Sequence, residues 1–214
     1  MIIYQPVSHL VRSMSNTKDH IIEAASRLMH LQGFNHTSID EVLRESGVGK
    51  GNFYYYFKSK EELGYAIIEN NLKQFSQYVI GKAFGNHRDP LSQVDDFLDI
   101  ILQLHRQRNC AGGCPLGNMA MELSDIHEGF RKKFQGIFES WRMHVSTVLQ
   151  KAKESGQLSD HADPTSLAQF IVASVEGAIL LTKVKKNIRV LENCFNELKK
   201  HIRMYIGYRA PLSQ

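Results

Sequence analysis

The segment from Thr37 to Lys60 constrains the fold most strongly, because its residues predict two short helices joined by a glycine turn. The run Ser38-Ile39-Asp40-Glu41 has the capping-box pattern, in which the serine caps a helix start and the glutamate bonds back to it. Gly47 is suited to ending that helix, since glycine accepts a positive φ at little cost. A second short helix follows over about Gly49–Phe57, and Ser59–Glu62 repeats the capping-box pattern. Together these signals predict a helix-turn-helix.

The second short helix has one apolar side and one side suited to DNA. If Phe53 and Phe57 face the core, a rotation of about 100° per residue turns Gly51 and Tyr55 outward. The outward surface then comprises Lys50, Gly51, Asn52, Tyr54 and Tyr55. Asparagine can pair with adenine, lysine can reach guanine acceptors and tyrosine hydroxyls can bind phosphates, while a glycine lets the backbone approach the duplex closely. This surface predicts a recognition helix for the major groove of DNA.

Two other interpretations of the segment carry less weight. The three tyrosines at 54–56 could be partly buried aromatic side chains. The run Gly47–Gly51 could be a phosphate loop, but it lacks the G-x-x-x-x-G-K-[ST] spacing and a preceding strand. The formal net charge of +4 suits a nucleic-acid partner without demonstrating one. The helix starts near Ser38 and Lys60 also offer backbone N–H groups that favour phosphate.

The residues 33–42 read GFNHTSIDEV and the residues 47–63 read GVGKGNFYYYFKSKEEL. Both stretches closely resemble the DNA-binding domain of the TetR family of bacterial regulators, and the likeness is dense over residues 17–65. It implies an all-helical homodimer, usually a repressor, that releases its operator when a ligand binds the C-terminal domain. It implies base contacts from Lys50 and Asn52, and phosphate contacts from Thr37, Ser38, Tyr54, Tyr55, Tyr56 and Lys60. Gly49 departs from the serine that the family usually carries, yet glycine caps a helix nearly as well.

Helical periodicity continues along the rest of the chain, so we expect an all-α protein of about nine helices. The expected helices span Thr17–Gln32, Ser38–Ser46, Gly49–Phe57, Ser59–Ala83, Leu91–Arg108, Asn118–Leu123, Ile126–Lys153, Asp163–Lys186 and Ile188–Ile206. Residues 1–16 are expected to be a disordered extension, with Met14 as an alternative start. Residues 17–65 form the predicted helix-turn-helix domain, and residues 66–214 form a larger ligand-sensing and dimerisation domain.

The helix expected over Asp163–Lys186 is apolar on more than one face, which suits burial in its own core and against a partner. The alternative is a central core helix in a monomer. The family resemblance implies that the last two helices of each subunit form a four-helix dimer interface. Two recognition helices about 34 Å apart would then read a pseudo-palindromic operator.

The turn Gly113-Cys114-Pro115-Leu116-Gly117-Asn118 resembles an element of one TetR branch, some members of which respond to electrophiles or oxidants through this cysteine. A lysine on a later helix, here Lys183, can lie near that thiol. A thiol beside a helix N-terminus and a cation has a lowered pKa and becomes nucleophilic. The alternative is that Cys114 is a buried small hydrophobic residue at a tight turn.

The sequence indicates an effector pocket less clearly than it indicates the other sites. Such pockets are mostly apolar with a few polar groups, and plain core packing produces the same pattern. The candidate lining residues are Met119, Phe134, Phe138, Trp141 and Met143, with Glu122 and Glu176 as the polar groups. A zinc site at Cys110 and Cys114 with His105 and His127 has only loose ligand spacing and no second compact pair. We expect neither a metal nor another cofactor.

The sequence also argues against other classes of protein. It contains no G-x-S-x-G, H-E-x-x-H, Glu-x-x-His or dinucleotide-binding motif, so we do not expect an enzyme. Three cysteines and no recognisable secretory signal indicate reduced thiols in a cytoplasmic protein. The longest apolar stretch, around Ala168–Leu181, looks too short and too polar to span a bilayer. An architectural DNA-binding protein without a ligand remains an alternative to a ligand-responsive regulator.

Overall fold

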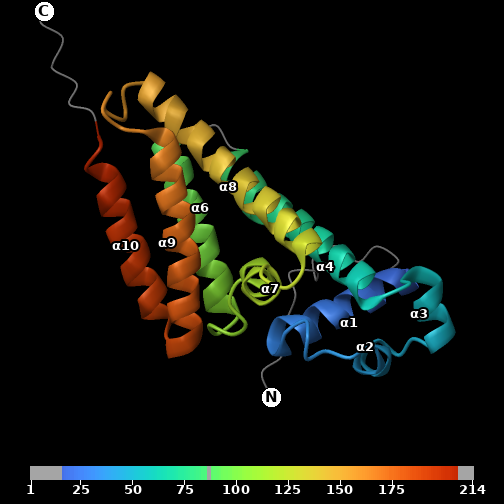
Figure 1. The fold of residues 1–214 in the computed structure, drawn as a ribbon. Helices are drawn as coiled ribbons and strands as arrows, with labels where there is room; N and C mark the ends of the chain where they lie inside the picture. The colour runs from blue at the N-terminus through green and yellow to red at the C-terminus, as the bar shows by residue number, and fades with distance from the viewer. Residues whose placement is uncertain (1–15, 86–87, 207–214) are drawn as a thin grey trace, which may run out of the picture. The chain divides into compact units, whose positions relative to one another are not determined.

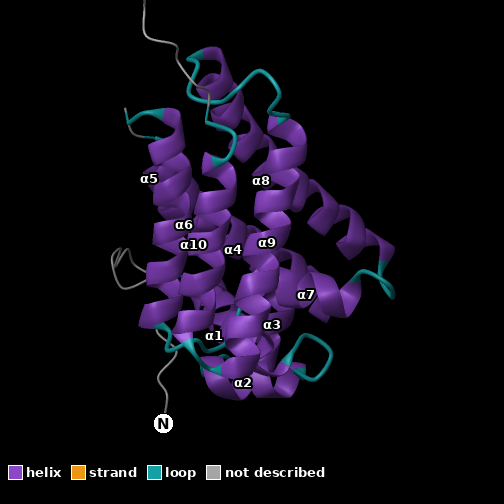
Figure 2. Cartoon of the chain, turned by 90° about the vertical axis from the view of Figure 1, so that its left-hand side faces the viewer, coloured by secondary structure: helices purple, strands orange, loops and turns teal. Residues whose placement is uncertain are grey.

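The computed structural model describes residues 16–85 and 88–206, and this part of the chain is all-helical, as the sequence predicts (Figures 1 and 2). Within it, the one β feature is an isolated antiparallel bridge between Leu158 and Ile206. The helices are α1 (Thr17–Gln32), α2 (Ile39–Ser46), α3 (Lys50–Tyr56), α4 (Lys60–Phe75), the π-helix η2 (Ser76–Ile80), α5 (Gly81–Phe84), α6 (Pro90–Gln107), α7 (Pro115–Leu123), α8 (Glu128–Glu154), α9 (Pro164–Lys185) and α10 (Ile188–Arg203). The extension expected at residues 1–16 lies outside the described residues except for Asn16, whose side chain caps α1.

The stretch from Lys60 to Phe84 is continuous helix, which the sequence predicts as a single element. Its hydrogen-bond pattern changes at Ser76–Ile80, where a π-helical turn separates α4 from α5. If α4, η2 and α5 are counted as one helix, the described residues form nine helices, as expected. Apolar periodicity gives no sign of the π turn, because such turns add one residue to an otherwise regular helix.

The described residues form two compact units that are not contiguous in sequence. The first contains the residues up to Phe75 together with Cys114–Phe134, and the second contains Ser76–Gly113 and the residues from Gln135 onward. The expected boundary after residue 65 differs from this division in two respects. The first unit extends ten residues further along α4, and it also includes α7 and the start of α8.

Aromatic packing joins the distant segments of the first unit. The ring of Tyr65 stacks on that of Phe130 with centroids 4.4 Å apart, and Phe34 meets the same ring edge-on at 5.5 Å. A Cβ atom on Gly64 would lie 2.7 Å from the Phe34 ring and 2.9 Å from the Phe130 ring. Because real Cβ atoms do not approach so closely, the absence of a side chain at Gly64 is what allows the start of α8 to pack here.

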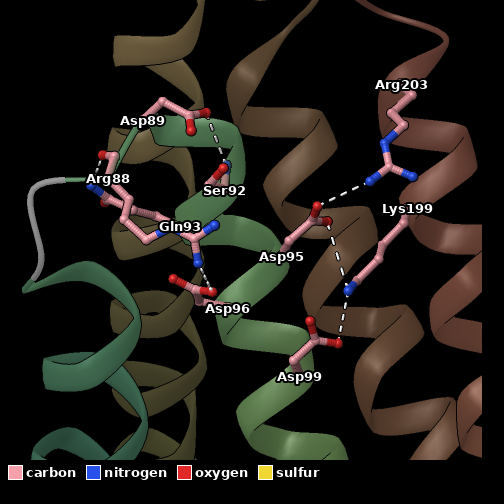
Figure 3. Close-up of polar contacts among 9 residues, drawn as sticks. All are labelled: Arg88, Asp89, Ser92, Gln93, Asp95, Asp96, Asp99, Lys199 and Arg203. Carbon is pink, nitrogen blue, oxygen red and sulfur yellow. Dashed lines mark hydrogen bonds and ion pairs between the residues drawn. The ribbon is translucent and has the colours of Figure 1, made fainter.

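In the second unit, α6, α9 and α10 lie side by side (Figure 1). Charged side chains join α6 to α10 (Figure 3). The ammonium of Lys199 lies 2.7 Å from a carboxylate oxygen of Asp99 and 3.9 Å from one of Asp95, and Arg203 lies 3.1 Å from Asp95. The Lys199 side chain is only 15% exposed, so this pairing is shielded from solvent more than a typical surface ion pair. It fixes one side of α10 against α6.

The helix α9 is apolar on two faces, as the sequence predicts. One face is buried and contains Leu167, Ala168, Ile171, Val172, Val175, Ala178, Ile179 and Thr182. The other exposes Phe170, Leu180, Leu181 and Val184, with Ala173 and Gly177 between them. Contrary to our expectation, an 18-residue window of α9 does reach the length and mean hydropathy (1.6) of a membrane-spanning helix. Since 44% of that window is buried and core helices have the same composition, this is weak evidence for a membrane span.

Candidate DNA-binding site

The helix α3 presents the face that its sequence predicts. Phe53 and Phe57 are buried, at 0% and 1% exposure, and anchor the helix in the first unit. Tyr55, on the opposite side, is 75% exposed. The other exposed residues of this face are Lys50, Gly51, Asn52 and Tyr54. Tyr56 is half-buried, and its ring meets that of Tyr55 edge-on at 4.9 Å. The inward and outward faces predicted for this helix are therefore observed.

Short-range backbone features hold α3 in place. Ser38 accepts a hydrogen bond from the Glu41 N–H at 3.2 Å, and Glu41 accepts one from the Ser38 N–H at 2.7 Å, so the predicted capping box is present. The bond from the Ser38 N–H, together with one from the Ser38 hydroxyl, holds the pKa of the Glu41 carboxyl below its usual value. Gly47 ends α2 with φ +68°, a conformation that favours glycine. Gly49 then caps α3 in an extended conformation without a side-chain hydrogen bond.

Thr37 lies in a different place from the one that its predicted role requires. It is fully buried, and its hydroxyl donates to the Gly33 carbonyl at 2.7 Å. The prediction that Thr37 contacts phosphate through its side chain is therefore wrong, because the hydroxyl faces the interior of the unit. Ser38, the next residue, is exposed, and its hydroxyl oxygen lies 2.8 Å from Glu41. It remains available at the surface.

Lys60 is held within the first unit. Its ammonium donates to the Asn35 carbonyl at 3.2 Å and lies 4.7 Å from the centroid of the Phe34 ring. Partial burial lowers the pKa of Lys60, and the nearby carboxylate of Glu122 acts in the opposite direction. The predicted phosphate contact of Lys60 would therefore compete with these contacts.

The start of α4 also differs in detail from the predicted second capping box. Ser59 accepts a bond from the Glu62 N–H at 3.1 Å, as that motif requires. The Glu62 carboxylate, however, accepts from the N–H of Lys58 at 2.7 Å and not from that of Ser59. Ser59 thus still caps α4, while the returning bond of Glu62 goes to the residue before the cap.

Glu122 has a contact that the sequence does not reveal. Its carboxylate oxygens accept hydrogen bonds from the N–H groups of Phe34 at 2.8 Å and Asn35 at 2.6 Å. These residues form the turn between α1 and α2, nearly ninety positions earlier in the chain. Glu122 was expected in an effector pocket, and the structure instead places it on the backbone of the helix-turn-helix.

The other expected sensor residues fall in both units. In the first unit, Cys114 is partly exposed and accepts a hydrogen bond from the Gly117 N–H at 3.3 Å, which caps α7. Phe134 and Met119 are buried there. In the second unit, the rings of Phe138 and Trp141 meet edge-on at 5.2 Å, Glu176 and Lys183 are partly exposed, and Met143 is exposed. The closeness of Cys114 to Lys183 stays a prediction, because they belong to different units.

Cys110 is buried, and burial raises the pKa of its thiol above the ordinary value. A thiol in this setting is less nucleophilic than an ordinary one. Among the residues that the structure describes, no three His, Cys, Asp or Glu side chains are grouped so that they could hold a metal ion.

Gly51 offers a direct test of whether α3 approaches DNA closely. A Cβ atom at this position would meet nothing within 4 Å in the protein. Replacing Gly51 by alanine should therefore stabilise the helix by roughly 0.5–1 kcal/mol, since glycine is a poor helix former. The same change should weaken DNA binding, because the methyl group would stand between the backbone and the duplex. Thermal unfolding and fluorescence-anisotropy titration should show these opposite effects. Unchanged or tighter DNA binding would mean that the backbone at Gly51 does not approach the duplex.

Comparison with known proteins agrees with this geometry. Residues 21–67 match the family model "Bacterial regulatory proteins, tetR family", and residues 90–198 match "Tetracyclin repressor-like, C-terminal domain". An uncharacterised HTH-type transcriptional regulator of Lactococcus lactis is 35% identical over 88% of this chain and 94% of its own length.

Solved structures share the fold as well. The regulatory protein TetR from Rhodobacter sphaeroides superposes with a TM-score of 0.81 at 27% identity, covering 87% of this chain and 99% of that one. The reduced form of the Escherichia coli transcriptional repressor NemR gives a TM-score of 0.72 at 25% identity, covering 92% of this chain and all of that one.

Proposed function

This chain belongs to the TetR family of bacterial regulatory proteins, and we propose that it is a homodimeric repressor released from its operator by a small-molecule effector. Members of this family are DNA-binding transcriptional regulators rather than enzymes. Relatives named as repressors, such as NemR, support repression rather than activation. The site of action is the cytoplasm, where the DNA lies, and the protein associates with the nucleoid when it is bound.

The exposed face of α3 carries the proposal. Lys50 and Asn52 lie where they can reach base edges in the major groove, and Tyr54, Tyr55 and Tyr56 can bind the flanking phosphates. Ser38 supplies a further hydroxyl at the start of α2. A second, weaker phosphate candidate is Lys60, which would have to leave the Asn35 carbonyl.

The exposed apolar face of α9 supports the homodimer. Phe170, Leu181 and Val184 are large apolar side chains that are 47%, 48% and 71% exposed in the single chain. Burying them against a second copy would remove this surface from water, and a two-fold axis would set two α3 helices about one DNA turn apart. The proposed interface uses α9 and α10, and the proposed operator is a pseudo-palindrome.

A gel-shift titration against DNA from upstream of the protein's own gene tests the proposal. A repressor should prefer this DNA over random duplex by about 10³-fold or more at fixed salt, and raising the salt should weaken both complexes. An architectural protein would bind both DNAs equally. A protein that binds neither would contradict DNA binding itself.

For the sensor, we propose that an electrophile or oxidant reacts at Cys114. The thiol stands at the start of α7, where the helix dipole favours a thiolate. The resemblance to an electrophile-responsive branch supports this choice. Phe138, Trp141 and Glu176, all of the second unit, are the proposed lining of an effector pocket.

A thermal-shift screen with reactive electrophiles, repeated with Cys114→Ser, tests the sensor. We expect at least one compound to shift the melting temperature of the wild-type protein by several degrees and to leave the variant unchanged. The buried Cys110 gives a matched control, since Cys110→Ser should keep the response. If every compound acts equally on the wild-type protein and on Cys114→Ser, the thiol is not the sensor.

A further inference from the structure

The two hydrogen bonds that Glu122 accepts single out one turn of the protein. The N–H groups of Phe34 and Asn35 point to one carboxylate, at 2.8 and 2.6 Å. Hydrogen bonds from two amides to an ionised acceptor are stronger than neutral ones. The turn between α1 and α2 has no helical partner for these groups, so the carboxylate satisfies donors that would otherwise rely on water.

The fit around this carboxylate leaves little room for movement. Gly33 has φ +94°, and a Cβ atom there would lie 3.1 Å from a Glu122 oxygen. On the other side of the turn, the Lys60 ammonium holds the Asn35 carbonyl at 3.2 Å. The turn is therefore held from α7 by Glu122 and from α4 by Lys60. We call this arrangement the turn clamp, and it consists of Gly33, Phe34, Asn35, Lys60 and Glu122.

The turn clamp leads directly into the DNA-binding elements. Two residues after Asn35, Thr37 bonds back to Gly33 at 2.7 Å, and Ser38 then begins the cap of α2. The position of α2 thus follows from the position of the turn. On α7, the neighbours Leu116, Met119 and Leu123 are buried, so packing fixes where the carboxylate stands.

From these contacts we infer that Glu122 is a positioning residue for operator binding, which sets the turn before α2 and thereby the helix-turn-helix. It does not touch DNA in this role. The inference rests on the proposed function, because positioning matters only if α3 reads an operator. Since a hydrogen bond is lost when its atoms separate by about 1 Å, a small displacement of α7 withdraws the carboxylate and releases the turn.

Variants at Glu122 test this role. Glu122→Ala removes both acceptors and should weaken operator affinity about tenfold or more. Glu122→Gln keeps one acceptor oxygen but turns an N–H donor toward the second amide. Its operator affinity should therefore lie between those of the wild-type protein and Glu122→Ala. The matched control is Glu128→Gln, an exposed carboxylate of the same unit that pairs with Arg131 on its own helix. It should stay within about twofold of the wild-type affinity.

Two further measurements separate positioning from other effects. The slope of log affinity against log salt should stay unchanged in the Glu122 variants, because no phosphate contact is lost. In ¹H–¹⁵N NMR spectra of the DNA-free protein, the amide resonances of Phe34 and Asn35 should shift in Glu122→Gln and not in Glu128→Gln. Affinities are measured per active dimer, well below the melting temperature of each variant.

The outcomes are distinct. Unchanged amide resonances in Glu122→Gln would disprove the turn clamp. Shifted resonances with wild-type operator affinity in both variants would disprove the positioning role and leave the proposed function intact. If the wild-type protein itself shows no preference for operator DNA, the proposed function fails and the positioning role fails with it, even where the amide signals confirm the turn clamp.

Discussion

Replacement of Asn52 by alanine should strongly weaken specific operator binding while the dimer stays intact. A bidentate contact between an amide and a base is worth roughly 1–3 kcal/mol. Because a symmetric dimer would lose it twice, operator affinity should fall by a factor of about 30 or more. Asn52 is exposed beside the buried anchor Phe53, so its removal leaves the packing of α3 untouched. Binding to random duplex, which depends on phosphate contacts, should change little.

Anisotropy titrations on operator and random DNA measure this loss, and light scattering monitors the dimer. Tyr55→Phe is a useful comparison, since it removes one hydroxyl from an exposed side chain on the same face. It should weaken binding to both DNAs to a similar degree, as expected for a phosphate contact. Wild-type operator affinity in Asn52→Ala would show that this face of α3 does not read bases.

Gly177→Arg should convert the protein to a folded monomer that no longer holds its operator. Gly177 lies on the exposed apolar face of α9, where an added Cβ atom meets nothing within 4 Å in the single chain. In a two-fold interface the new arginines would face each other and bury two unpaired charges. Arginine is also a better helix former than glycine, so the helix itself should not suffer. Operator affinity should fall by about 10²-fold or more, because each half-site would then bind alone.

Gly136→Arg is the matched control for this change. Gly136 is an exposed glycine of α8 that also has open space at its Cβ position, and it lies outside the proposed interface. Sedimentation equilibrium should find Gly136→Arg dimeric and Gly177→Arg monomeric, with the same helical circular dichroism for both. A dimeric Gly177→Arg would place the subunit contact elsewhere than on this face of α9.

Features set by neighbouring residues could be predicted from the sequence. The bounds of α1, the capping box at Ser38 and the outward face of α3 all depend on residues within about four positions of one another. The two faces of α9 follow from periodicity alone. In each case the local rule and the packed structure agree, so no distant contact had to be known.

Features set by distant residues could not be predicted in this way. Glu122 was predicted as a polar group of an effector pocket, and its partners are amides 87 and 88 positions away. The need for glycine at position 64 likewise depends on the Phe130 ring, far along the chain. These relationships require the three-dimensional arrangement, which periodicity and capping rules do not encode.

The first unit combines two separate segments of the chain, and this has a consequence for how the protein folds during synthesis. Phe130 and Glu122 leave the ribosome long after Phe34 and Gly64, so the early segment cannot reach its final packing during most of translation. A nascent chain of 75 residues would expose the rings of Phe34 and Tyr65 and would lack the acceptor for two turn amides. The first unit should therefore complete its packing only after residue 134 has emerged.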